Sequence, residues 1–185
     1  MSSISVRPIS GRDIAAVVAL WQKAGLTVPH NDPYEDIRFC RRSSNAEILL
    51  GFEKENLSAA AMVGHDGHRG WYYYVGVDPD SHGSGLGRGI MAAAEDWLVS
   101  RGVGKAQLMI RPTNAAVKAF YERLGYVEED RLVMAKRFGP APDWQAGQCA
   151  TTVIHLEMLS PPDRAPAIPP ETGREIALQR MAVPT

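Results

Sequence analysis

The sequence between His82 and Tyr126 decides the fold. It begins with His82-Gly83-Ser84-Gly85-Leu86-Gly87 and ends with Phe120-Tyr121-Glu122-Arg123-Leu124-Gly125-Tyr126. The alternating glycines lead directly into an apolar stripe at helical spacing, which predicts a helix whose N-terminal N–H groups can bind a phosphate. Thr113 or Asn114 is the predicted N-cap of a second helix, and Asn114 stands seven residues before Tyr121, whose phenol this helix carries. The stretch therefore favours an enzyme that binds a phosphorylated ligand and does chemistry beside it.

Other phosphate-binding glycine motifs do not fit this spacing. A dinucleotide fingerprint needs Gly-x-Gly-x-x-Gly, but the third positions counted from Gly83 and Gly85 are Arg88 and Ile90. A P-loop needs Gly-Lys-Ser/Thr, which does not occur in the chain. The remaining alternative is a flexible turn in which the glycines only supply conformational freedom.

The composition sets the outer limits on structure and partners. At 185 residues, with 45% hydrophobic and 22% charged residues, the chain can bury one core. A formal net charge of −1 gives no reason to expect nucleic acid or an anionic membrane as a partner. Cys40 and Cys149 are too few for a disulfide framework and have no metal-ligand spacing. With no apolar run of about 20 residues and no N-terminal signal, we expect a cytoplasmic protein.

The periodicity of the remaining sequence predicts a mixed α/β sheet whose early part is antiparallel. Helices are predicted at residues 10–25, 32–42, 86–101 and 114–125. Strands are predicted at residues 4–8, 47–52, 57–64, 71–77, 105–110, 132–138 and 151–159. Five prolines between residues 160 and 170 indicate a linker. We therefore expect one α/β domain over residues 1–159, with about seven strands and four helices, and a Pro-rich linker and tail over 160–185.

The two motifs and the order of elements resemble the GCN5-related N-acetyltransferase (GNAT) superfamily. Within it, Asn31-Asp32-Pro33, the run from Asp66 to Gly70 and the run from Tyr121 to Tyr126 are similar to a bacterial subgroup, the YpeA-like acetyltransferases. The resemblance implies a mostly antiparallel sheet that splays between its fourth and fifth strands. It also implies transfer of acetyl from acetyl-CoA to a primary amine, by direct attack in a ternary complex and without a metal.

The resemblance also assigns the cofactor contacts. The pyrophosphate loop of the family is Arg/Gln-x-x-Gly-x-Gly/Ala, so Gly85 and Gly87 match, whereas His82 replaces the usual Arg or Gln. The loop needs only its backbone N–H groups to bind the pyrophosphate. The His82 side chain has two alternatives, a contact with phosphate or a position facing solvent. The expected cofactor-binding residues are Val75, Val77, His82, Gly83, Ser84, Gly85, Leu86, Gly87, Arg88, Asn114 and Tyr121.

Tyr121 matches the general acid of the family, which protonates the departing thiolate. The alternative is that Tyr121 is a core residue, because it shares a helix face with apolar neighbours. Asn114 is compatible both with an N-cap and with a contact to the cofactor arm. The backbone N–H that stabilises the oxyanion is expected near Val77, with Gly76 permitting a distortion of the strand there.

The general base and the acceptor are the least determined parts of the site. Asp66 and His68 precede the fourth strand and are the candidate catalytic groups for the acceptor side, although turn formation alone would explain Asp66-Gly67. The aromatic run from Trp71 to Tyr74 is expected to pack in the sheet. The alternative function is an acetyl-CoA sensor without turnover, or an assembly module that acts through the tail; a homodimer is compatible with both.

Overall fold

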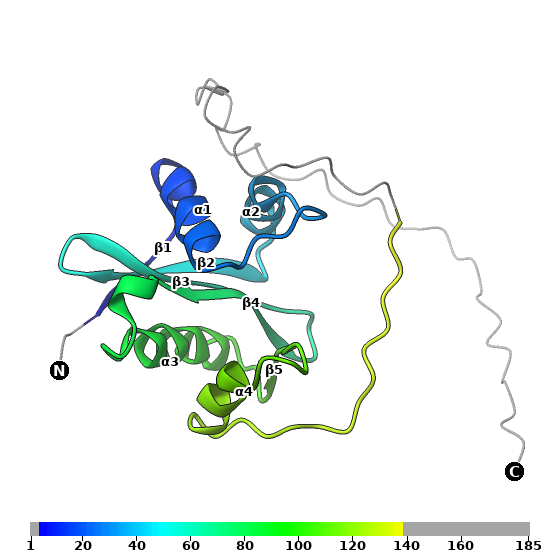
Figure 1. The fold of residues 1–185 in the computed structure, drawn as a ribbon. Helices are drawn as coiled ribbons and strands as arrows, with labels where there is room; N and C mark the ends of the chain where they lie inside the picture. The colour runs from blue at the N-terminus through cyan, green and yellow to red at the C-terminus, as the bar shows by residue number, and fades with distance from the viewer. Residues whose placement is uncertain (1–3, 139–185) are drawn as a thin grey trace, which may run out of the picture. The chain divides into compact units, whose positions relative to one another are not determined.

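The computed structural model describes residues 4–138 of the chain (Figure 1). The strand predicted at 151–159 and the domain boundary predicted at residue 159 lie outside the described residues. The described part is a sheet with helices on both faces, which confirms the mixed α/β architecture.

The sheet has five strands in the order β1-β2-β3-β4-β5. Their bounds are β1 Ser5–Pro8, β2 Ala46–Glu53, β3 Asn56–His65, β4 Gly70–Val77 and β5 Ala106–Gln107. The first four strands pair antiparallel with their neighbours, and only β5 runs parallel to β4. β2 and β3 form a hairpin that closes at Glu53↔Asn56, and Lys54 in its turn has a φ of 58°.

Four helices cover the two faces of the sheet. Their bounds are α1 Ile14–Lys23, α2 Pro33–Arg42, α3 Leu86–Val99 and α4 Ala115–Glu122. In Figure 1, α1 and α2 lie on one face, and α3 and α4 lie on the other. Asp32 is the N-cap of α2, because its carboxylate accepts the Tyr34 N–H at 2.8 Å and Pro33 stands in the first turn.

The apolar runs of β2 and β3 divide into two cores. Ile48, Leu50 and Ala60 pack with α1 and α2 in one buried cluster. Leu49 and Ala61 belong to the other cluster, which contains α3. Successive side chains of a strand point to opposite faces, so a strand covered on both faces needs a nearly continuous apolar run.

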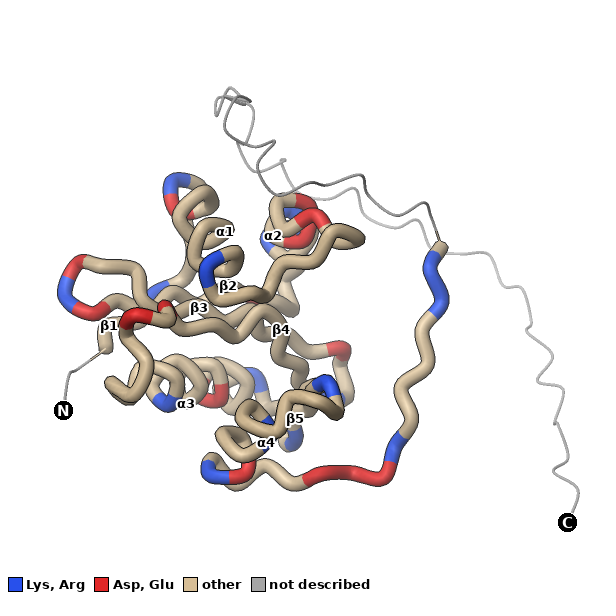
Figure 2. The backbone as a smooth tube through the Cα atoms, viewed as in Figure 1, with Lys and Arg blue, Asp and Glu red and all other residues tan. Residues whose placement is uncertain are grey.

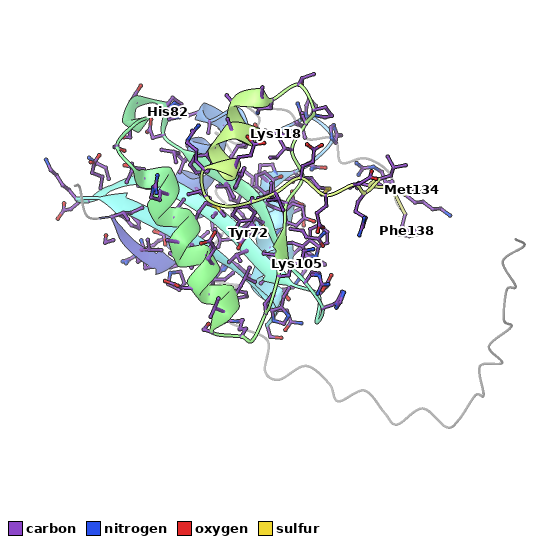
Figure 3. All side chains as sticks on the ribbon, turned by 90° about the horizontal axis from the view of Figure 1, so that it is seen from below. Tyr72, His82, Lys105, Lys118, Met134 and Phe138 are labelled. Carbon is purple, nitrogen blue, oxygen red and sulfur yellow. The ribbon has the colours of Figure 1, made fainter. Side chains whose placement is uncertain are left out.

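The described residues form five strands, so the prediction of a strand at 132–138 is wrong. Leu132 is 96% exposed, and Met134 and Phe138 are each 94% exposed. Figure 3 shows Met134 and Phe138 on this segment, away from the sheet. The segment has strand-like composition, but a strand also requires a neighbour for its backbone N–H and C=O groups.

Asp13 connects β1 to the start of α1. Its carboxylate accepts two hydrogen bonds from the Arg7 guanidinium, at 2.7 and 2.8 Å, and one from the Ser10 N–H at 2.8 Å. The hydrogen bond from Arg7 is the largest cause that holds the pKa of this carboxyl well below its usual range. The ionised form of Asp13 therefore favours the folded chain.

Asp13→Asn is expected to lower the free energy of unfolding at pH 7 by about 1–2 kcal/mol. This value already allows for the partial exposure of Arg7, which weakens the ion pair. A depressed pKa stabilises the fold above the unfolded pKa of about 3.9, and this contribution is lost as the pH falls. The difference between the variant and the parent should therefore shrink below pH 4. Urea unfolding at pH 7 and pH 3 measures it, and an equal difference at both values would contradict the assignment.

Candidate active site

The glycine loop before α3 leaves the N-terminus of this helix with N–H groups outside the helical ladder. Gly83 and Gly85 have φ angles of 80° and 90°, in the left-handed region that favours glycine. The first hydrogen bond of the helix runs from the Gly89 N–H to the Gly85 carbonyl at 3.0 Å. The N–H groups of residues 86–88 therefore precede the helical ladder and carry the positive end of the helix dipole. This arrangement fits a pyrophosphate.

His82 is exposed beside this N-terminus (Figure 3). Its backbone N–H donates to the Pro79 carbonyl at 3.3 Å and closes the short 3-10 turn Pro79–Ser81. The Ser84 hydroxyl donates to the Ser81 carbonyl at 2.6 Å, which stabilises the loop. Contact of the His82 side chain with phosphate stays a prediction.

Gly87 brings the loop into contact with α4. A Cβ on Gly87 would lie 3.3 Å from the Phe120 ring and 3.6 Å from a methyl group of Val77. A larger residue would push these groups by a few tenths of an ångström. The two motifs that are separated in the sequence therefore meet here, next to the end of β4.

The fourth strand contains a β-bulge at Tyr74 and Val75. In the β3–β4 ladder Ala60 pairs with Gly76 and Met62 with Tyr73, so two residues of β4 stand opposite one residue of β3. Tyr74 has a φ of 50°, which is strained for a residue with a bulky side chain. The expected distortion is present, but it precedes the predicted position at Gly76 and Val77.

Gly76 has a different role from the one predicted. Its lack of a side chain makes room for Leu26, whose Cδ1 would lie 2.7 Å from a Cβ at this position. Both Gly76 and Val77 keep regular partners in β3. The glycine therefore permits close packing of the segment after α1, and the strand distortion itself lies at Tyr74.

The fourth and fifth strands pair over a short stretch only, and the splay that the resemblance implies stays a prediction. The parallel pairing of β4 and β5 is limited to Gly70↔Ala106 and Trp71↔Gln107. Past Trp71, the described residues provide no further ladder on this side of β4, and the bulge lies in this unpaired part. Such an edge leaves backbone groups available to a ligand.

Tyr121 belongs to α4, which lies on the same face of the sheet as α3. Its side chain is buried, with 7% of the residue exposed, and its ring packs edge-on against Phe120 and Tyr126 at centroid distances of 5.1 and 5.5 Å. Its hydroxyl makes no hydrogen bond to another described residue. Burial raises the pKa of Tyr121 to about 12, so the hydroxyl keeps its proton near neutral pH.

The ring of Tyr126, which packs against Tyr121, contacts Glu95 and Tyr72. The Tyr126 hydroxyl donates to the Glu95 carboxylate of α3 at 2.8 Å. Tyr72 of β4 packs edge-on against Tyr126 at 6.2 Å between centroids, and burial followed by the hydrogen bond with Tyr72 raises the pKa of Tyr126. Figure 3 shows Tyr72 between α3 and α4. No local signal predicts the pairing of Tyr126 with Glu95, because Glu95 looks like an ordinary helical glutamate.

Asn114 is confirmed as the N-cap of α4. Its side-chain oxygen accepts the Val117 N–H at 3.2 Å, and the residue is exposed. A contact between Asn114 and the cofactor arm stays a prediction.

Asp66 and His68 lie in the turn between β3 and β4, at the opposite end of β4 from the glycine loop. Both carboxylate oxygens of Asp66 are engaged, by the N–H groups of His68 and Arg69 at 2.8 and 2.7 Å and by the Trp71 indole at 3.0 Å. These bonds, with that of Arg69 the largest, lower the pKa of Asp66. The geometry therefore gives Asp66 a structural role in the turn, and the catalytic role of both residues stays a prediction that their position does not favour.

The other side of the bulge carries residues that the sequence analysis did not assign to the site. The Tyr74 ring stacks on Trp21 of α1 at 4.2 Å between centroids, with 20° between the planes. The Tyr74 hydroxyl donates to the Asp36 carboxylate of α2 at 2.6 Å, across 38 positions of sequence. No local signal predicts this pair, because Asp36 resembles any acidic residue in a first helical turn.

Other site types find no support in the part of the chain that the structure covers. Over residues 4–138 there is no group of three or more His, Cys, Asp or Glu side chains arranged to hold a metal. Within the same range no helix is both long and apolar enough to cross a membrane. Cys40 is buried, and burial raises its thiol pKa to about 12, so it is a poor nucleophile.

Comparison with protein families and curated proteins gives one consistent result. The model of the acetyltransferase (GNAT) family matches residues 15–126. An acetyltransferase of Pectobacterium atrosepticum is 35% identical over 134 residues, which are 72% of this chain and 95% of the relative. The family match spans the glycine loop, the bulge and Tyr121.

Solved structures share the fold. The ribosomal-protein-S18-alanine N-acetyltransferase of Escherichia coli is 26% identical, with a TM-score of 0.57 over 69% of this chain and 79% of that protein. An aminoglycoside N-acetyltransferase in complex with CoA has a TM-score of 0.64 and 15% identity, over 75% of this chain and 97% of its own. At that identity the second likeness supports the fold alone.

Proposed function

Because this chain belongs to the GNAT family of acetyltransferases, we propose that it transfers acetyl from acetyl-CoA to a primary amine by direct attack in a ternary complex. Acetyl-CoA-dependent acetyl transfer is the shared activity of this family. Membership of the YpeA-like subgroup stays a prediction.

One observation carries the proposal. Gly87, in the first turn of α3, lies close to Val77 at the end of β4, and Val75, Val77, Phe120 and Tyr121 belong to one apolar cluster. Gly87 and Phe120 are in close contact, and the Phe120 ring packs on Tyr121 at 5.1 Å, which joins the phosphate end of the site to the acid. This order matches the order of pyrophosphate, pantetheine arm and thioester in acetyl-CoA.

The loop and the unpaired strand provide the cofactor contacts. The backbone N–H groups of residues 83–88 bind the pyrophosphate, with Gly85 and Gly87 keeping the approach open. Val75 and Val77 flank the pantetheine arm, and Asn114 and Tyr121 face it from α4. His82 and Arg88 are exposed at the loop and add positive charge when protonated or ionised.

The bulge supplies the donor for the thioester oxygen. A bulge leaves one residue without a ladder partner, and here that residue is Val75 or Tyr74. We assign the Val75 N–H as the group that stabilises negative charge on this oxygen when the amine attacks.

Proton transfer is divided between solvent and Tyr121. An alkyl ammonium has a reference pKa of about 10.4, so the acceptor first loses one proton to water. Its lone pair forms the C–N bond, and the C–S bond breaks with its electron pair going to sulfur. Tyr121 gives its hydroxyl proton to the sulfur, and the surplus proton on nitrogen then restores the phenol.

Calorimetry and a turnover assay together test the function. We expect saturable binding of acetyl-CoA with a Kd in the micromolar range, equivalent to about −8 kcal/mol. Release of free thiol should follow when amines are added, in a screen of amino acids, polyamines, aminoglycosides and peptides with N-terminal alanine. Binding without thiol release for any amine would support the alternative, a non-catalytic sensor, and absence of binding would contradict both.

The chain divides by composition into a catalytic part and a tail. We propose that residues 1–159 form the catalytic domain and that residues 160–185 form a Pro-rich linker and tail, on the composition of that segment. Turnover by a chain truncated after residue 159 at the rate of the full chain would support this division.

A further inference from the structure

The face of the bulge opposite α4 has the features of an acceptor site, an assignment that rests on the proposed function. Tyr74 occupies the bulge itself, stacks on Trp21 and donates its hydroxyl hydrogen to Asp36. Because the thioester carbon would lie at the bulge, an amine that reaches it from the α1–α2 face passes these side chains. Both Tyr74 and Asp36 are only partly buried, so a ligand can reach them.

An unpaired buried donor lies at the same place. The Trp21 side chain is fully buried, and its Nε1 is the one buried side-chain N or O without a hydrogen-bond partner among the described residues. Its Cδ1, the ring atom bonded to Nε1, is 3.8 Å from the position of a Cβ on Gly76. A buried N–H without an acceptor is unfavourable, and this one lies in the same packed cluster as Tyr74.

Acidic side chains lie at the start of α2, next to Tyr74. Asp36 and Asp32 belong to the start of α2, where Figure 2 shows acidic residues. Neither carboxylate forms a salt bridge with a described residue, whereas the neighbouring Glu35 is paired with Arg38. Burial is the largest cause that raises the pKa of Tyr74, and the hydrogen bond with Asp36 is the second. The Tyr74 hydroxyl therefore stays a neutral donor that orients the Asp36 carboxylate.

We propose that the acceptor carries a second positive charge in addition to the amine that is acetylated, and that Asp36 is its counter-ion. The reacting nitrogen must be neutral when it attacks, and a carboxylate beside it would hold it protonated. A separate cationic group has no such conflict and gains a charge-assisted hydrogen bond. Diamines, aminoglycosides and peptides with a basic side chain belong to this substrate class.

Matched pairs of small amines test the inference. Each diamine from 1,3-diaminopropane to 1,6-diaminohexane is compared with the amino alcohol of equal length, in which a hydroxyl replaces the second ammonium. We expect kcat/KM to favour at least one diamine by about tenfold or more, through a lower KM, as one charge-assisted hydrogen bond would give. Equal use of every pair, or use of neither member while acetyl-CoA still binds, would overturn the inference and leave the cofactor site intact. Loss of acetyl-CoA binding would overturn the proposed function as well.

Three variants assign the preference to one carboxylate. Asp36→Asn keeps the shape and removes the charge, so it should raise KM for the diamine about tenfold or more and leave that for the amino alcohol unchanged. Tyr74→Phe keeps the stack on Trp21 and loses only the hydroxyl, which should cause a smaller loss of the same kind. Glu35→Gln is the matched control, because this carboxylate belongs to the same helical turn but pairs with Arg38. An equal effect of Glu35→Gln and Asp36→Asn would overturn the assignment.

Discussion

Gly85→Glu is expected to reduce the affinity for acetyl-CoA by about a hundredfold or more, because it places a carboxylate where the pyrophosphate binds. Nothing lies within 4 Å of a Cβ at this position, so the variant meets no steric obstacle to folding. At a φ of 90° any side chain is strained, which costs about 1–3 kcal/mol. This strain lowers the stability of the fold and is separate from the loss of affinity for acetyl-CoA. Calorimetry with acetyl-CoA measures the affinity.

Gly102→Glu is the matched control for this prediction. Gly102 has a φ of 76°, also with nothing within 4 Å of a Cβ, and it follows the C-terminal end of α3. Gly102→Glu adds the same charge and a similar strain far from the glycine loop. It should therefore lose about as much stability as Gly85→Glu, while its affinity for acetyl-CoA stays that of the parent. Unchanged affinity of Gly85→Glu, or an equal loss in both variants, would contradict the assignment of the anion site.

Tyr121→Phe is expected to lower kcat by about a hundredfold or more while the affinity for acetyl-CoA stays within a factor of about two, as for loss of a general acid. The substitution removes only a hydroxyl that makes no hydrogen bond to a described residue, and the ring keeps its packing against Phe120 and Tyr126. Steady-state rates of thiol release give kcat. A sensor without turnover would show no such dependence.

Tyr126→Phe provides the contrast. Its hydroxyl is bound to Glu95, so its removal leaves a partly buried carboxylate with one partner fewer and should cost about 1–3 kcal/mol of stability. Turnover should change far less than in Tyr121→Phe. In the parent, because the pKa of Tyr121 is about 12, the rate should rise with pH as the amine loses its proton and show no fall from Tyr121 below about pH 10. Equal loss of kcat in both variants would contradict the role of Tyr121 as acid.

The local features of the fold could be predicted from the sequence because their causes are local. The caps Asp32 and Asn114 bind N–H groups two and three residues away, and Gly83 and Gly85 adopt the backbone angles that glycine favours. The apolar runs of β2 and β3 follow from a sheet covered on both faces. The strand predicted at 132–138 failed because composition does not supply a pairing neighbour.

The sequence by itself therefore determined the glycine loop, the two helices that follow it and the family to which the chain belongs, since each depends on residues close together in the chain. Only the tertiary structure placed the bulge at Tyr74, joined Gly87 to Phe120 and brought Asp36 of α2 to the hydroxyl of Tyr74. These contacts depend on how β4 registers against β3 and on how helices pack across the sheet, which no local pattern encodes. The donor side of the site is thus predictable from the sequence, whereas the acceptor side arises from packing between distant segments.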